Sequence, residues 1–199
     1  MNESGRLPDR NTTRRIISDF FIEHRALIVP PVLEVGSARP KEAWWADIQS
    51  QLGMQDEEWV GVDKKASPCT DVVWDINSGP IPRHLDLKHY GSCVCAEVLE
   101  HVDRPSRMLD SVRYFLLPGA WIVITTPFAF PVHESTSKDY WRFTPSGMTL
   151  LLKDAGFVDI QTWELEVYGV THFDHIYGLG GDKDWDLPLW IGAIARKPE

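Results

Sequence analysis

Four short apolar runs in this chain each end at or beside an acidic residue. The runs "VLEV", "VGVD", "VVWD" and "VCAE" place Glu34, Asp63, Asp75 and Glu97 at the ends of expected strands. Asp and Glu occupy 29 of the 199 positions, so four such coincidences are improbable for scattered acids. Because the carboxyl ends of strands in an open α/β sheet share one crevice, we expect these carboxylates to lie together. The alternative, that they only end strands or cap helices, is strongest for Asp75, which precedes the turn-forming "NSG".

Helical and strand-type patterns alternate along the chain. Thr144 followed by Pro145 is typical of a helix start, and Gly156 is typical of a helix end. Such alternation predicts an α/β fold with a Rossmann-like, seven-stranded mixed sheet and helices on both faces, and the two successive strands at the end predict that the last strand is antiparallel. The expected strands are 31–35, 59–63, 71–75, 92–97, 120–126, 157–167 and 188–196.

The length of 199 residues and the hydrophobic content of 43% suit one domain with a sizeable core. We therefore expect a single domain over 1–199. Its N-terminal part, 1–28, is expected to be a helical extension. The segment 168–187 is too long for a simple hairpin turn and is expected to be an insertion between the last two strands.

Charge and hydropathy bear on partners and location. The formal net charge of −9, without a basic block, makes nucleic acid an unfavourable partner. No apolar run reaches the roughly 18 residues that a membrane-spanning helix needs, and the polar N-terminus lacks the apolar core of a secretory signal. We expect a cytoplasmic protein without membrane contact, whose three cysteines are reduced. The sequence does not indicate an oligomeric state.

The loop after the first expected strand limits the choice of cofactor. A dinucleotide site uses the pattern G-x-G-x-x-G, whereas this loop has Gly36 followed by Ala38 and by Pro40, which has no N–H group. A crevice of carboxylates also suits pyrophosphate poorly. It suits S-adenosylmethionine, which has a ribose diol, an ammonium group and a sulfonium.

The order of motifs resembles that of class I S-adenosylmethionine-dependent methyltransferases, and in particular the broad group with an "LEH" signature. The similarity covers about 32–160 and includes "VLEVGSARP", "GVD", "VVWDI" and the long run that begins "AEVLEHV" and passes through "DYWRFT". The resemblance implies that Asp63 accepts hydrogen bonds from both ribose hydroxyls and that Asp75 and Ile76 flank the adenine. It implies that the methionine end is bound by Glu34, Gly36, Ser37, Ala96 and Glu97, and a role for Arg39 at the cofactor carboxylate stays open.

Candidate residues for the acceptor follow the fourth and fifth expected strands. His101 and His133 are candidate general bases, since histidine titrates near neutral pH, although His101 can equally be a structural residue that binds backbone. Asp139 and Tyr140 are candidate acceptor contacts. Trp141 and Arg142 belong to "DYWRFT", which in the resembling group is largely architectural, so we expect them to anchor the loop.

Other motifs carry less weight. His172, Asp174 and His175 have metal-ligand chemistry but no supporting cluster, so we expect no metal site. The resemblance implies methyl transfer to a small-molecule or sugar-like acceptor. Two alternatives stay open, namely a methyltransferase acting on a macromolecule and a binding or scaffold protein that does not catalyse transfer.

Overall fold

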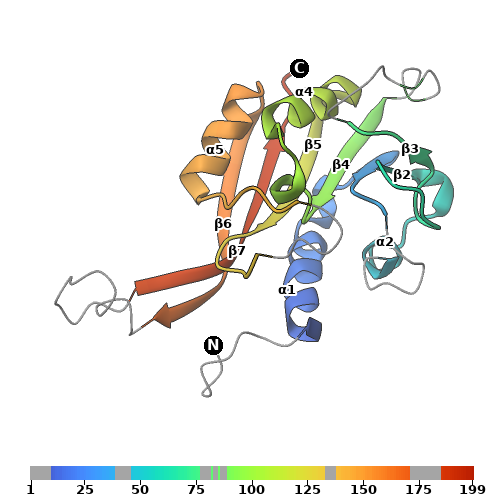
Figure 1. Cartoon of the computed structure of the whole chain (residues 1–199). Coiled ribbons are helices and arrows are strands. Elements are labelled where there is room, and N and C mark those ends of the chain that lie inside the picture. Colours follow the sequence, from blue (N-terminus) through green and yellow to red (C-terminus); the bar gives the residue numbers. More distant parts are fainter. Residues whose placement is uncertain are drawn as a thin grey trace.

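The computed structural model describes residues 10–38, 46–76, 82, 85, 89–132, 138–170 and 185–199. It contains a seven-stranded sheet with the order β3-β2-β1-β4-β5-β7-β6 (Figure 1). Strands β1 to β5 are parallel, and β7 runs antiparallel to both β5 and β6, which confirms the predicted mixed sheet. The strands are β1 Val32–Val35, β2 Trp59–Asp63, β3 Val72–Val73, β4 Tyr90–Ala96, β5 Leu116–Pro127, β6 Val158–Val170 and β7 Trp185–Arg196.

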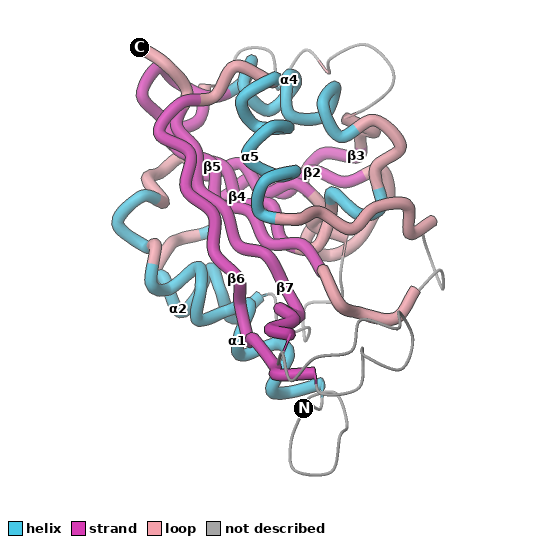
Figure 2. The backbone as a smooth tube through the Cα atoms, turned by 90° about the vertical axis from the view of Figure 1, so that its left-hand side faces the viewer, coloured by secondary structure: helices cyan, strands magenta, loops and turns pink. Residues whose placement is uncertain are grey.

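Helices cover both faces of the sheet, as predicted. Figure 2 shows α1 (Arg10–Glu23) and α2 (Ala46–Leu52) on one side of the sheet and α4 (Pro105–Phe115) and α5 (Pro145–Asp154) on the other. Neighbouring residues of a strand pack against different helix layers, because successive side chains point to opposite faces of the sheet. In β1, Val32 packs with the α1 and α2 layer, and its neighbour Leu33 packs with the α4 and α5 layer.

Helix α5 begins where the sequence predicts. The hydroxyl of Thr144 accepts a hydrogen bond from the backbone N–H of Gly147 at 3.0 Å, which makes Thr144 the N-cap. Pro145 takes the first helical position, where its missing N–H costs nothing. Gly156 follows the helix with a φ of +80°, a conformation that glycine adopts easily. Both ends of α5 are therefore fixed by local residues.

Three strands extend well beyond their predicted bounds, whereas β3 is shorter than the predicted 71–75 and ends at Val73, so that Asp75 follows the strand instead of ending it. Strand β5 begins at Leu116 instead of residue 120 and includes Pro118 and Gly119, because the backbone of Gly119 pairs with Lys197. Strands β6 and β7 extend to a pair between Val170 and Trp185, so both enter the segment 168–187 that was predicted as an insertion. Cross-strand pairing of this kind joins distant residues, and a local pattern does not report it. In Figure 1 the far ends of β6 and β7 extend beyond the rest of the sheet.

The strand order reverses between β1 and β4. From β1 the chain moves outward to β2 and β3, and then returns to the other side of β1 as β4. In open α/β sheets, ligands bind outside the carboxyl ends of the strands at such a reversal. Three short 3-10 helices complete the described elements: η1 Arg25–Leu27, η2 Asp56–Glu58 and η3 Leu99–His101. Among the described residues, no helix is long and apolar enough to cross a membrane.

Candidate functional site

A cavity of about 330 Å³ lies at the strand reversal. Residues from the ends of β1, β2 and β4 and from the segment after β3 line it, so four separate parts of the chain meet there. Its size is at the lower end of the range of small-molecule sites. The predicted site residues that line it are Gly36, Asp63, Asp75, Ile76, Ala96, Glu97 and His101.

Gly36 makes the turn out of β1, where any side chain would be strained and crowded. Its φ is +85°, and its N–H donates to the carbonyl oxygen of Val62 at 2.9 Å. A Cβ atom at this position would lie 2.2 Å from Cγ2 of Val98. The loop therefore packs directly against the segment after β4, and its backbone forms one wall of the cavity.

Asp63, the last residue of β2, is held by two backbone donors. Its Oδ2 accepts from the N–H of Ala38 at 3.1 Å, and its Oδ1 accepts from the N–H of Lys65 at 2.8 Å. A carboxylate has about four acceptor positions, so each oxygen can accept one more hydrogen bond. The side chain is thus oriented at the cavity with room for a pair of hydroxyl donors.

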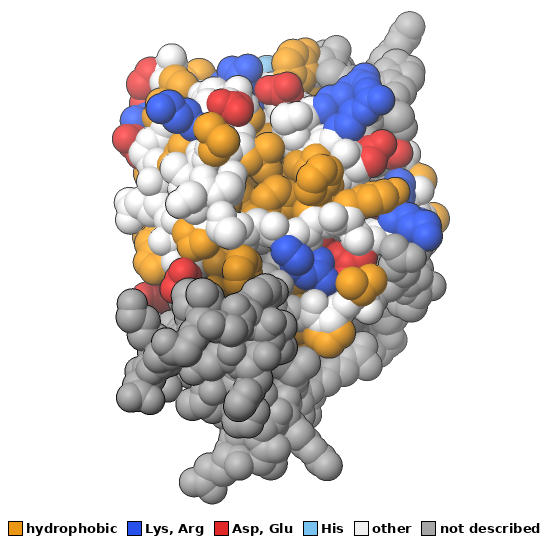
Figure 3. Space-filling view, turned by 60° about the vertical axis from the view of Figure 1, so that its left-hand side comes forward, with side chains coloured by type: hydrophobic (Ala, Val, Ile, Leu, Met, Phe, Trp, Pro, Cys, Tyr) orange, Lys and Arg blue, Asp and Glu red, His pale blue; other side chains and the backbone are white. Residues whose placement is uncertain are grey.

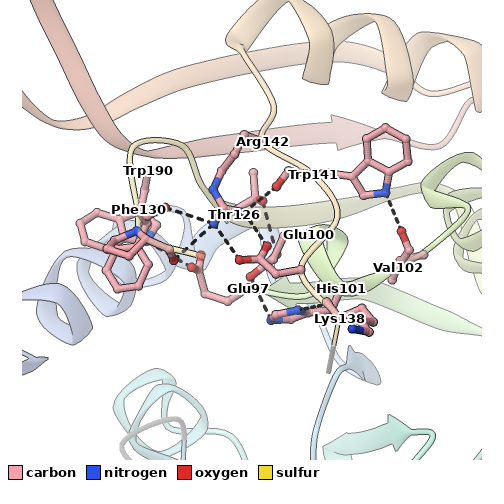
Figure 4. A network of polar contacts seen from close by, with 12 residues as sticks. Glu97, Glu100, His101, Val102, Thr126, Phe130, Lys138, Trp141, Arg142 and Trp190 are labelled. Atoms are coloured by element: carbon pink, nitrogen blue, oxygen red, sulfur yellow. Dashed lines mark hydrogen bonds and ion pairs between the residues drawn. The ribbon is translucent and has the colours of Figure 1, made fainter. Parts of the chain in front are cut away.

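Glu97 directly follows β4 and has a strained backbone. Its φ is +54°, which is uncommon for a residue with a Cβ, yet its N–H still donates to the carbonyl oxygen of Thr125 at 3.0 Å. The indole N–H of Trp190 donates to Oε2 at 3.1 Å (Figure 4). Burial raises the pKa of Glu97 to about 7, although its hydrogen bonds and the charge of Arg142 act in the opposite direction.

Glu100 and His101 lie in η3 beside Glu97 (Figure 4). Glu100 is completely buried, and burial together with the nearby charges of Glu97 and Asp139 raises its pKa well above the usual value. His101 lines the cavity, and its Nδ1 lies 2.6 Å from the carbonyl oxygen of Lys138. Because a carbonyl only accepts, Nδ1 carries the proton. The Nε2 atom lies 3.7 Å from Oε1 of Glu100.

The segment 138–143 is fastened over this end of the sheet. The guanidinium of Arg142 binds both oxygens of Asp139, at 2.5 and 2.8 Å, and also donates to the carbonyl oxygen of Phe130 at 3.1 Å. The indole of Trp141 donates to the carbonyl oxygen of Val102 at 2.7 Å. These contacts confirm the predicted anchoring by Trp141 and Arg142.

The two predicted acceptor contacts in this segment differ in exposure. The Asp139 side chain has no exposed surface, because it is paired with Arg142, so it has no surface through which to touch an acceptor. The side chain of Tyr140 is 52% exposed but is not among the described residues that line the cavity. Hydrophobic side chains are visible between charged ones on the face of the molecule shown in Figure 3.

Two of the predicted cofactor residues lie elsewhere. Glu34 and Ser37 are buried, and neither is among the described residues that line the cavity. Glu34 alternates with Leu33 and Val35 along β1, so its side chain points to the opposite face, where the indole of Trp59 donates to it at 2.8 Å. The expectation that every strand-end acid faces one crevice is therefore wrong for Glu34, because a shift of one residue along a strand changes the face.

The sequence interpretation missed other residues of the cavity. Lys64, Lys65 and Trp74 line it. Lys64 and Trp74 directly adjoin a selected acid, and Lys65 lies two residues after Asp63. His133, His172, Asp174, His175, Arg39 and Pro40 lie outside the described residues. Within the part of the chain that the structure describes, no group of three or more His, Cys, Asp or Glu residues is arranged to hold a metal ion.

No family model and no curated protein matches this chain. Among solved structures, a methyltransferase dependent on S-adenosylmethionine from Archaeoglobus fulgidus superposes with a TM-score of 0.64 and 17% identity, over 92% of this chain and 94% of that chain. The Burkholderia thailandensis 1,6-didemethyltoxoflavin-N1-methyltransferase, solved with S-adenosylhomocysteine, has a TM-score of 0.60 and 15% identity, over 96% and 80% of the two chains.

The chain has the fold of S-adenosylmethionine-dependent methyltransferases. Human N-acetylserotonin methyltransferase, solved with S-adenosylmethionine, shares this fold with a TM-score of 0.57 and 16% identity, over 94% of this chain and 52% of that chain. At these identities the similarity establishes the methyltransferase fold itself, and the activity is argued from the site.

Proposed function

We propose that this protein transfers a methyl group from S-adenosylmethionine to a small-molecule acceptor by in-line displacement. One observation carries the proposal: Gly36, Asp63, Asp75 and Glu97, which come from four segments of the chain, line a single cavity at the strand reversal of a methyltransferase fold. Scattered acids with only structural roles have no reason to meet in this way.

The residues of the cavity fit the cofactor. The positive φ of Gly36 and its close contact with Val98 fix the loop whose backbone forms one wall of the cavity. In this proposal Asp63 accepts hydrogen bonds from the two ribose hydroxyls, and Asp75 and Ile76 flank the adenine; all three line the cavity. When bound, S-adenosylmethionine would supply an electrophilic methyl group on a positively charged sulfur. The remaining task of the protein is to orient the acceptor and to exclude water, which can supply about 7–11 kcal/mol.

Two alternatives remain as outcomes of a test. A protein that binds the cofactor without transfer would have the same cavity, and a macromolecular acceptor would need a larger surface. The formal net charge of −9 disfavours a nucleic acid.

Isothermal titration calorimetry tests the cofactor assignment directly. We expect S-adenosylmethionine and S-adenosylhomocysteine to bind in the micromolar range and NAD to bind at least a hundredfold more weakly, because pyrophosphate would meet a carboxylate-rich site. Binding of neither adenosyl ligand at millimolar concentration would refute the proposal. Release of S-adenosylhomocysteine during incubation with an acceptor mixture separates transfer from binding alone.

A further inference from the structure

The segment 138–143 borders the cavity. The indole N–H of Trp141 donates to the carbonyl oxygen of Val102 at 2.7 Å, and Nδ1 of His101 donates to the carbonyl oxygen of Lys138 at 2.6 Å (Figure 4). Val102 and His101 both line the cavity. Hydrogen bonds therefore hold this segment directly at the edge of the cavity.

A second segment, 128–132, follows β5 and is joined to the first by Arg142. The guanidinium of Arg142 donates to the carbonyl oxygen of Phe130 at 3.1 Å and also binds the carboxylate of Asp139 at 2.8 Å. The side chain of Asp139 has no exposed surface, so the ion pair serves to connect the two segments. We call the segments 128–132 and 138–143 together the rim.

Exposed hydrophobic side chains are concentrated on the rim. Val132 is 73% exposed, Tyr140 is 52% exposed and Trp141 is 42% exposed. Among the described residues nine large hydrophobic side chains are exposed, and three of them fall within the eleven residues of the rim. Single exposed hydrophobic residues are normal, whereas several together beside a ligand cavity are typical of a binding surface.

Most of the hydrophobic side chains of the rim are aromatic, and two of the rings are held in place by other rings. Trp141 stacks on Phe143 with centroids 6.3 Å apart and an angle of 28° between the planes. Phe130 packs against Trp190 with centroids 5.7 Å apart (Figure 4). The ring of Tyr140 is half exposed beside them in the chain. Fixed aromatic rings favour a ligand that is itself flat and aromatic.

The rim lies on the side of the cavity that the residues assigned to adenosine leave open. Asp63 and Ile76 follow β2 and β3, which lie on one side of β1. The rim contacts the segment after β4 and includes the segment after β5, which lie on the other side of β1. In S-adenosylmethionine the sulfur that carries the methyl group is attached to the ribose, away from the adenine. An acceptor on the rim would therefore approach the methyl group from the side opposite the adenine.

We propose that the acceptor is a small aromatic molecule, and that its ring packs on Val132, Tyr140 and Trp141 at the rim. The inference rests on the proposed function, since it names the acceptor class of the same site. A sugar-like acceptor needs several hydrogen-bond partners for its hydroxyl groups. The guanidinium of Arg142, the carboxylate of Asp139 and the indole N–H of Trp141 are already bonded within the fold, so the rim offers an aromatic ring more than it offers a sugar.

Calorimetry on the protein saturated with S-adenosylhomocysteine tests the acceptor class with three probes. Naphthol is aromatic, decahydronaphthol is its saturated analogue with the same hydroxyl group, and methyl glucoside represents a sugar-like acceptor. We expect naphthol to bind about fivefold more tightly than decahydronaphthol, because ring–ring contacts add to the burial of apolar area. Methyl glucoside should not bind at millimolar concentration.

Two tyrosines of equal exposure provide a matched pair of variants. Tyr140→Ser should weaken naphthol binding at least threefold and leave the affinity for S-adenosylhomocysteine within twofold of the wild type. Serine keeps the backbone N–H that donates to the carbonyl oxygen of Glu100 at 2.7 Å, so the fold of the segment should persist. Tyr114, which is 50% exposed, lies near the end of α4, where the chain enters β5 at the opposite edge of the sheet. Tyr114→Ser should therefore leave naphthol binding unchanged.

Each other result overturns the inference. If naphthol is not preferred to decahydronaphthol, or if Tyr140→Ser keeps the wild-type affinity for naphthol, the rim does not select an aromatic ring. Binding of methyl glucoside that Tyr140→Ser abolishes would indicate a sugar-like acceptor instead. If no probe binds, the rim does not hold a small acceptor, and a macromolecule is its occupant. The wild-type protein would still bind S-adenosylhomocysteine in all these cases, and failure of that binding would refute the proposed function itself.

Discussion

The indole N–H of Trp59 donates to a carboxylate oxygen of Glu34 over 2.8 Å, and both side chains are 6% exposed. This contact joins two neighbouring strands on the sheet face that α1 and α2 cover. A buried carboxylate without its donor costs more than an ordinary lost hydrogen bond. The relationship gives Glu34 a structural role, and this role can be separated from cofactor binding.

Trp59→Phe should lower the free energy of unfolding by about 1–3 kcal/mol, because it removes one hydrogen-bond donor to a buried carboxyl group. In the Glu34→Gln background the same change should cost at least about 1 kcal/mol less, since no buried charge remains. Urea unfolding measures both values. We expect the affinities of Trp59→Phe and Glu34→Gln for S-adenosylhomocysteine to lie within threefold of the wild-type affinity. A tenfold weaker affinity of Glu34→Gln would mean that Glu34 does contribute to cofactor binding.

Gly36→Ala should disrupt the cavity wall. The new Cβ would lie 2.2 Å from Val98, so the loop after β1 or the segment after β4 must move. We expect unfolding to become easier by about 2–4 kcal/mol and the affinity for S-adenosylhomocysteine to fall at least tenfold. Gly53→Ala is a matched control with a φ of +72° and nothing within 4 Å of its Cβ, and it should cost only about 1 kcal/mol with unchanged affinity. Equal effects of the two changes would argue against a packed loop.

Asp63→Asn should weaken the binding of S-adenosylhomocysteine by about 1–3 kcal/mol, as expected for a lost hydrogen bond to a charged group. Asparagine is preferred to alanine because its oxygen can still accept one of the two backbone N–H groups, from Ala38 or Lys65, that Asp63 holds. Calorimetry gives the affinity, and Asp110→Asn controls for the loss of one negative charge. An affinity equal to that of the wild type would remove Asp63 from the site.

The raised pKa of Glu97 predicts a pH-dependent stability. Between its usual value of 4.5 and about 7, the folded state binds more protons than the unfolded state, so the free energy of unfolding falls as pH rises through this window. The contribution of this one group is about 3 kcal/mol. Urea unfolding at pH 5, 6, 7 and 8 should show a smaller decrease for Glu97→Gln than for the wild type. Parallel curves for the two proteins would mean that Glu97 is ionised to the same extent in the folded and unfolded states throughout this range, so that its pKa is not raised by folding.

Arg142→Ala should loosen the segment 138–143. It leaves the Asp139 carboxylate, which has no exposed surface, without its guanidinium partner, and we expect a loss of about 3–5 kcal/mol of stability. Asp139→Asn in the same background should restore part of this loss, because an uncharged amide is cheaper to bury. Thermal and urea unfolding measure the effect. A loss below about 1 kcal/mol for Arg142→Ala would show that the pair does not hold the segment.

Local patterns predicted much of this fold. The cap at Thr144 and the strand at 59–63 were found at their observed positions, because their signals lie within a few residues. Gly36, Asp63 and Glu97 were selected because each directly follows or ends an apolar run. Lys64 and Lys65 were overlooked for lack of any pattern of their own. The length of β5, β6 and β7 depended on distant pairing partners, which a window of sequence does not contain.

The sequence by itself determined the order of strands and helices and the placement of acids at strand ends, because both depend on neighbouring residues. The tertiary structure decided how each acid is used. Glu34 faces Trp59, which is 25 residues away, and Oε2 of Glu97 is bound by Trp190, which is 93 residues away. The polar partners that orient or bury a carboxylate come from distant parts of the chain, so only the folded arrangement shows whether an acid faces the cavity or the core.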